Sequence, residues 1–189
     1  MKKKWAFTAA AGVLGGLFLA GVLEVGSSTG WFGLEELASQ GVPSWEYSYE
    51  TTWDPSQDGV EGLSIRWAVG PVSVMPGEGP LITVTEYASR PLEEGERLAL
   101  SSSGGVLEVG WNGSLLPLGA LQDLEKRVEV KVPPELLSQL EELSCWNISG
   151  EVSVSGAFAQ ELSLGSLAGD LFLTGVSGEK AAVSTVSGD

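Results

Sequence analysis

The sequence predicts an all-β domain of the parallel β-solenoid type, preceded by a single N-terminal transmembrane helix. Three features predict it: a repeat of about nineteen residues near the C-terminus, alternating apolar and polar residues within each repeat, and glycine at fixed places. Apolar residues two positions apart are typical of β-strands. Equivalent units stacked like neighbouring strands, about 4.8 Å apart, would bury these residues as continuous columns.

The N-terminal segment is expected to anchor the chain in a membrane. Residues 5–23 carry no charge and approach the ~20 residues that a helix needs to cross a bilayer. Three lysines precede this run and Glu24 follows it, which places the N-terminus in the cytoplasm and the remainder outside. A cleaved signal peptide would look similar, but Phe18 stands two places before Ala20, so no small-x-small cleavage site closes the run.

Between the anchor and the β domain, residues 24–59 have no long period and are interpreted as a juxtamembrane linker with one short helix at Leu34–Ser39. The β domain is expected over residues 60–189. Its early strands include "GLSIRWAVG" and "PLITVTEY", short alternating runs bounded by Gly or Pro. The segment "PPELLSQLEELS" could form a short helix or an early strand, and the sequence leaves both open.

The repeat itself consists of apolar and glycine columns. The apolar columns are Leu143/Leu162/Ala181, Cys145/Leu164/Val183, Ile148/Leu167/Val186, Val152/Leu171 and Val154/Leu173, and the glycine columns are Gly150/Gly169/Gly188 and Gly156/Gly175. Glycine supplies turn dihedrals without steric cost, so each unit is expected to hold two short strands and two turns, with every apolar column facing inward. A β-sandwich with hairpins of equal length is the alternative.

The charge of the chain limits its partners. The net charge is −15, and all 25 acidic residues follow residue 23, together with only seven of the ten basic residues. Nucleic acid and anionic lipid surfaces require basic patches, so neither is expected as a partner.

The side chains needed for common catalytic chemistry are missing. The chain has no histidine, which removes Ser–His–Asp and Cys–His nucleophile activation and most zinc sites. Its single cysteine, Cys145, cannot form an internal disulfide and is expected to be buried in its apolar column. No catalytic, cofactor-binding or metal-binding residue is predicted. A glycosidase using two carboxylates is the enzyme alternative, with Glu93–Glu94 and Glu141–Glu142 as weak candidates.

One acidic column follows the first glycine column: Glu151, Asp170 and Asp189. Like charges one unit apart repel, and a calcium ion could compensate them. We expect instead that they lie in exposed turns, where water and salt screen them, because the repeat supplies few other oxygen ligands.

Four short motifs carry a family resemblance. They are Val130-Lys131-Val132-Pro133, Ser149-Gly150-Glu151-Val152, Ala168-Gly169-Asp170-Leu171 and Ser187-Gly188-Asp189. These motifs resemble the bacterial putative-adhesin family, a domain of unknown function with β-strand repeats. The resemblance covers residues 60–189 and implies a right-handed solenoid-like domain on the cell surface, without established catalytic residues. Glu151 in place of Asp and Ala168 in place of Ser are mild departures.

These observations predict a non-enzymatic surface protein of the cell envelope, an adhesin or binding scaffold for a protein or polysaccharide ligand. The alternatives are a sensory ectodomain of an envelope-stress system and, less favoured, a polysaccharide-active enzyme. Asp189 follows a turn without a partner strand, so further repeats or a partner chain are expected at that open edge.

Overall fold

The computed structural model describes residues 45–111 and 124–188, which are almost entirely β-structure. The strands are β1 (Tyr47–Trp53), β2 (Gly62–Val69), β3 (Val72–Pro76), β4 (Ile82–Ala88), β5 (Leu98–Ser103), β6 (Val106–Trp111), β7 (Lys126–Val132), β8 (Leu140–Ser149), β9 (Val152–Ser155), β10 (Phe158–Ala168), β11 (Leu171–Thr174) and β12 (Ser177–Ser187). The short helices are α1 (Pro55–Asp58), η2 (Glu94–Glu96) and α2 (Pro134–Leu137).

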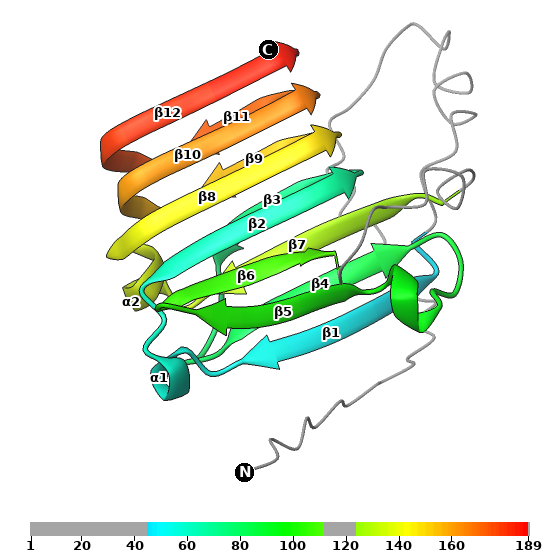
Figure 1. Cartoon of the computed structure of the whole chain (residues 1–189), viewed down its shortest axis with the longest axis horizontal. Helices are drawn as coiled ribbons and strands as arrows, with labels where there is room; N and C mark the ends of the chain where they lie inside the picture. Colours follow the sequence, from blue (N-terminus) through cyan, green and yellow to red (C-terminus); the bar gives the residue numbers. More distant parts are fainter. Residues whose placement is uncertain (1–44, 112–123, 189) are drawn as a thin grey trace, which may run out of the picture.

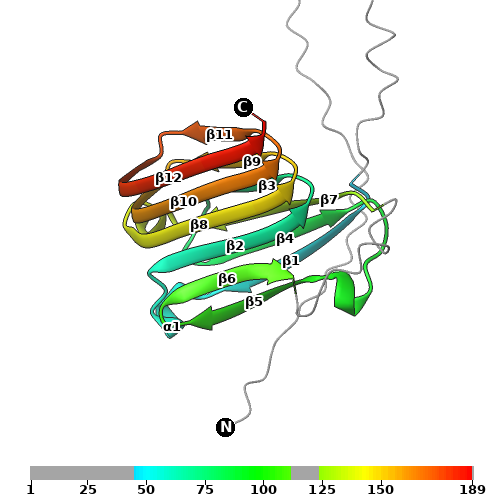
Figure 2. The same ribbon diagram turned by 45° about the horizontal axis from the view of Figure 1, so that its top comes forward.

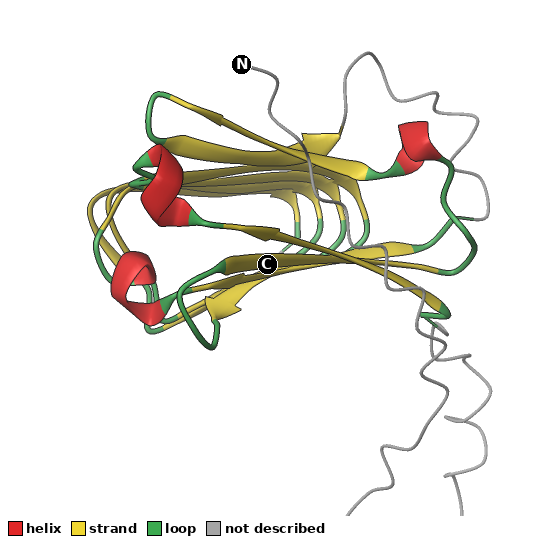
Figure 3. Ribbon diagram, turned by 90° about the horizontal axis from the view of Figure 1, so that it is seen from below, coloured by secondary structure: helices red, strands yellow, loops and turns green. Residues whose placement is uncertain are grey.

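The strands form two facing layers of six (Figures 1 and 3). Sheet A has the order β1-β4-β7-β3-β9-β11, and sheet B has the order β12-β10-β8-β2-β6-β5. Both sheets are mixed: neighbours from β7 to β11 and from β12 to β6 run parallel, while β1, β4 and β5 pair antiparallel with their neighbours. Figure 2 shows the parallel strands of sheet B stacked in front of those of sheet A. The prediction of a mostly β fold with parallel strands is confirmed.

The nineteen-residue repeat appears directly as strand register. Leu162 of β10 pairs with Leu143 of β8 and with Ala181 of β12, and Leu164 pairs with Cys145 and Val183 in the same way. In sheet A, Leu171 of β11 pairs with Val152 of β9. The columns therefore stack on adjacent parallel strands, as predicted.

The core lies between the two sheets, where inward residues of the repeat meet those of the upstream strands. Its members include Leu63, Ile65, Val72, Val74, Val128, Val130, Leu143, Cys145, Val152, Val154, Leu162 and Leu164. Burial fades toward the last strands: Val183 is 47% exposed and Leu173 is 39% exposed, because no described strand packs beyond β12 or β11. Whether further repeats or a partner chain cover this edge stays a prediction.

One predicted column faces the wrong way. The column of Ile148, Leu167 and Val186 was expected to point inward, but all three side chains are exposed on the outer face of sheet B. Strand alternation continues through the buried Asn147, so its neighbour Ile148 must face outward. Asn147 takes the inward position because its amide donates hydrogen bonds at 3.0 Å to the carbonyls of Gly70 and Gly150 in the adjoining turns.

The stacking order differs from the order of the strands in the sequence. The unit formed by β2 and β3 lies between β6 and β7 on one side and β8 and β9 on the other. The sheet also begins before residue 60: β1, within the range expected to be a linker, pairs along its length with β4. Hydrogen bonding of extended backbone to β4 draws this segment into sheet A.

The segment "PPELLSQLEELS" contains both expected elements, because α2 is followed at once by β8. The predicted helix at Leu34–Ser39 and the anchor at residues 5–23 lie outside the described residues. Within residues 45–111 and 124–188, no helix is long and apolar enough to cross a bilayer.

Candidate functional site

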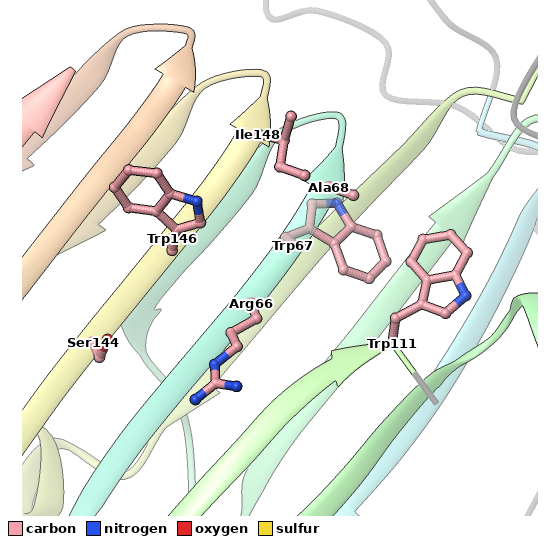
Figure 4. A pocket seen from close by; sticks show the side chains of 7 residues that line it. All are labelled: Arg66, Trp67, Ala68, Trp111, Ser144, Trp146 and Ile148. Atoms are coloured by element: carbon pink, nitrogen blue, oxygen red, sulfur yellow. The ribbon is translucent and has the colours of Figure 1, made fainter. Parts of the chain in front are cut away.

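The outer face of sheet B carries a groove of about 380 Å³. Its lining residues are Arg66, Trp67, Ala68, Trp111, Ser144, Trp146 and Ile148. They come from β2, β8 and the end of β6, with Trp146 and Ser144 on one side of Arg66 and Trp111 on the other (Figure 4). We call this feature the Arg66–Trp146 groove.

Strand register brings the two residues of its name together. Arg66 of β2 pairs directly with Trp146 of β8, and both face outward because their neighbours Ile65 and Cys145 are buried in the core. Glycine stands on each flank of the pair: Gly110 of β6 is opposite Arg66, and Gly165 of β10 is opposite Trp146. Across sheet B, the long side chains of Arg66 and Trp146 therefore lie side by side, and the glycine on each flank has no side chain.

The glycine at position 165 determines where the Trp146 indole lies. A Cβ built at Gly165 would collide with atoms Cζ3 and Cε3 of Trp146, so the indole rests against the backbone of β10. Trp146 is 45% exposed in this position. The arrangement presents a broad aromatic surface to solvent at one side of the groove.

Beneath the other side of the groove, a buried cation supports two tryptophans. The rings of Trp67 and Trp111 have centroids 5.4 Å apart, and Lys126 Nζ lies 4.1 Å from the Trp111 centroid and 5.2 Å from that of Trp67. Lys126 donates hydrogen bonds to the carboxylate of Glu86 and the carbonyl of Glu96. Burial lowers the pKa of Lys126, and the neighbouring Glu86 carboxylate opposes that shift. The cation–π contacts and the ion pair hold this part of the groove in place.

Arg66 differs from the other basic residues of the described chain in having no charged or aromatic partner there. The partners of the others are Glu96 for Arg90, the Tyr49 ring for Arg97, Glu86 for Lys126, Glu129 for Arg127 and Lys131, and Glu161 for Lys180. No hydrogen bond or ion pair joins the Arg66 side chain to another described residue. Its guanidinium is exposed and available to an anion.

The acidic residues considered from sequence do not converge on a site. Glu93 precedes η2 and Glu94 is its first residue, and both are exposed. Glu141 and Glu142 are exposed at the start of β8. Their surroundings therefore give no support to a pair of catalytic carboxylates.

The acidic column lies in stacked turns, where the backbone N–H of Val152 donates a hydrogen bond to the carbonyl of Asp170. Glu151 and Asp170 are exposed after their glycines, and Asp189 lies outside the described residues. Across residues 45–111 and 124–188, no three acidic, Cys or His side chains are grouped so that they could hold a metal ion. Cys145 is buried as predicted, and desolvation raises the pKa of its thiol to about 12, which keeps it protonated.

Sequence reasoning missed the groove. A signal existed in the alternation around Cys145: if Leu143 and Cys145 face the core, Trp146 must face solvent. The pairing of Trp146 with Arg66 had no such signal, because eighty positions separate them in the chain and only the strand order brings them together.

Comparison with known proteins found a likeness of fold but no match to a protein family. No protein-family model matches the chain, and no curated protein matches it. The structure resembles the crystal structure of a putative cell adhesion protein from Clostridium sporogenes, with a TM-score of 0.51 at 14% sequence identity over 73% of this chain and 67% of that chain. At this identity the likeness concerns the fold.

Proposed function

We propose that this chain is a non-enzymatic, adhesin-like surface protein that binds its ligand through the Arg66–Trp146 groove. In this proposal residues 5–23 span the cell membrane with the N-terminus in the cytoplasm. The β domain stands outside as a right-handed solenoid-like stack, of the kind expected for the putative-adhesin family.

The observation that carries the proposal is the groove itself. An exposed tryptophan and an unpaired arginine stand side by side on a sheet face, in a protein whose other described basic residues are engaged. Binding sites typically combine an apolar, aromatic lining with a few polar groups that orient the ligand, and this groove has that composition. The fold likeness to a protein described as a putative cell adhesion protein supports the same function.

The test of the surface location uses intact bacterial cells that produce the full chain. Protease added outside should digest the β domain and leave a short membrane-bound fragment. Full protection of the β domain in intact cells, with digestion only after lysis, would contradict the proposed orientation. Recovery of the native protein in the medium, with an N-terminus beyond residue 20, would mean that the anchor is cleaved.

The test of adhesion compares cells that produce the wild-type chain with cells that lack it, on surfaces coated with glycans or with matrix proteins. We expect the chain to increase retention under flow, and Trp146→Ala to abolish the increase. The matched control is Phe172→Ala, because Phe172 is an exposed aromatic on β11 of the opposite sheet, 52% exposed. Equal retention with and without the chain on every surface would contradict the function.

A further inference from the structure

We propose that the Arg66–Trp146 groove binds a carboxylated sugar residue of a glycan. The pyranose ring stacks on the Trp146 indole, and the sugar carboxylate pairs with the Arg66 guanidinium. This assignment names the ligand class for the binding function proposed above and rests on it.

The shape of the groove suits a flat ring. A pyranose exposes apolar C–H groups on its faces, and burying them against an aromatic ring removes apolar surface from water. The Trp146 indole lies over Gly165, with its ring against the backbone of β10. Gly110, at the far end of the same row, has no side chain to obstruct a sugar that reaches Arg66.

The positive charge of Arg66 indicates that the ligand carries an acidic group. Arg66 is the basic residue without a partner among the described residues, and its planar fork matches a carboxylate with two parallel hydrogen bonds. Glu108, on the same outer face of β6 two residues before Gly110, instead accepts a hydrogen bond from Ser101 Oγ at 3.2 Å. The Arg66 charge is therefore left for a ligand.

The net charge of the whole chain limits how acidic the glycan can be. A molecule with a net charge of −15 repels polyanions at long range. The local cation attracts one carboxylate, while the remaining surface disfavours a dense row of them. The ligand is therefore a glycan with isolated or terminal acidic sugars, not a highly sulfated or phosphorylated polymer.

The strand pairing argues against an extended acidic peptide. Such peptides commonly bind by adding a strand to a free sheet edge. Here β2 is paired with β6 and β8, and β8 is paired with β2 and β10, so both strands of the groove are interior. Their backbone groups are occupied by the sheet, and recognition must come from the side chains.

The experiment measures binding of defined sugars to the purified full chain in detergent by titration calorimetry. The probes are 3′-sialyllactose and lactose, galacturonic acid and its methyl ester, and a glutamate-rich peptide. We expect at least one acidic sugar to bind about tenfold or more tightly than its uncharged counterpart, because hydrogen bonds to charged groups contribute that much. The peptide should not bind.

Two variants assign the two interactions, and two more serve as controls. Arg66→Gln should remove the preference for the acidic form while leaving weak binding of both forms, and Trp146→Ala should remove both. The controls are Arg127→Gln, at a half-buried arginine on sheet A, and Phe172→Ala, and both should bind as the wild type does. A fifth variant, Gly165→Ala, should displace the indole and weaken both forms while Arg66 still favours the acid.

Three outcomes would overturn the assignment: no acidic sugar binds more tightly than its uncharged counterpart, Arg66→Gln keeps the preference, or the peptide binds as well as the sugars. The adhesion assay separates this failure from failure of the proposed function. If Trp146→Ala abolishes adhesion but acidic sugars do not bind, the ligand class is wrong and the binding function stands. If the chain does not increase adhesion at all, the function itself is wrong.

Discussion

At the scale of single residues, burial in this domain depends on the parity of a position within its strand. Leu164 is 2% exposed and Leu167, three residues later on β10, is 45% exposed. Fully burying a leucine side chain stabilises a fold by about 1.5–3 kcal/mol. An inward leucine such as Leu164 therefore contributes more to the stability of the folded state than an outward one such as Leu167. The outward ones contribute an apolar surface beside the groove.

This difference predicts effects of very different size for the same substitution. Leu164→Asp should prevent folding or lower the free energy of unfolding by several kcal/mol, because an unpaired carboxylate would be buried between the sheets. Leu167→Asp should change it by about 0.5 kcal/mol or less, since that side chain faces solvent. Denaturant melts of both variants check the prediction. Similar melts for the two would mean that the assigned faces are wrong.

The ion pair of Arg90 with Glu96 predicts a pH dependence. The Arg90 guanidinium donates hydrogen bonds of 2.8 and 2.7 Å to the Glu96 carboxylate, and its contact lowers the Glu96 pKa from 4.5 to about 2. A lowered carboxyl pKa stabilises the folded state at pH above the unfolded value, and the contribution disappears as the pH falls through the folded value.

Glu96→Gln should therefore be less stable than the wild type by about 1 kcal/mol or less at pH 7, as expected for a partly exposed pair. The difference should begin to shrink below pH 4.5 and vanish near pH 2. Urea melts across this range measure it. A difference that stays constant from pH 7 to pH 2 would contradict the assigned cause.

At the scale of elements, the turns between the sheets stack as closely as the strands do. The backbones of Gly70, Gly150 and Gly169 lie one above another, and a Cβ built at Gly150 would lie 2.5 Å from the carbonyl carbon of Gly70. Gly150 also has a φ of 121°, which side chains other than glycine rarely adopt. Asn147, below the turn, donates hydrogen bonds to the carbonyls of both Gly70 and Gly150.

This packing predicts that Gly150→Ala is strongly destabilising. The added methyl group meets backbone that cannot move without separating two units, and the dihedral angle adds strain of about 1–3 kcal/mol. Gly95→Ala is the control, because a Cβ there meets nothing within 4 Å. We expect a clear loss of melting temperature for Gly150→Ala and little change for Gly95→Ala. Equal melting temperatures would show that the turns can separate freely.

At the scale of the whole molecule, the two sheets are joined by a buried charge as well as by apolar side chains. Lys126 and Glu86 belong to neighbouring strands of sheet A, and both are essentially inaccessible to solvent, at 0% and 1% side-chain exposure. Lys126 Nζ faces the rings of Trp67 and Trp111, which come from sheet B. Glu86 also accepts a hydrogen bond of 3.0 Å from the backbone N–H of Leu98, at the start of β5.

Removing only one charge of this ion pair should destabilise the fold more than removing both charges. Lys126→Met leaves the Glu86 carboxylate buried without its cation, which typically destabilises a protein by about 3–5 kcal/mol. The double variant Lys126→Met with Glu86→Gln removes the unpaired charge and keeps an acceptor for Leu98, so it should recover part of the loss. Denaturant unfolding of the single and double variants measures the difference. A single variant as stable as the wild type would contradict the structural role of the pair.

Much of the repeat could be predicted because it depends on local pattern. Alternation identified the strands, glycine identified the turns, and the nineteen-residue interval identified which residues stack, as with Leu143 and Leu162. The column of Ile148 was predicted wrongly because an apolar residue was preferred to the polar Asn147 at an inward position. Asn147 is buried only because turn carbonyls lie within reach of its amide, and those carbonyls come partly from Gly70, far away in the chain.

The sequence by itself determined the β-class of the domain, its parallel repeat and the burial of Cys145, because these follow from periods of two and nineteen residues that are read directly from the chain. Only the tertiary structure decided the order of the strands, the place of β1 and β2 in the sheets, and the meeting of Arg66 with Trp146. The physical reason is that backbone hydrogen bonding between parallel strands depends little on which strands are paired. The choice of neighbour is made by packing of the whole core, and the groove follows from that choice.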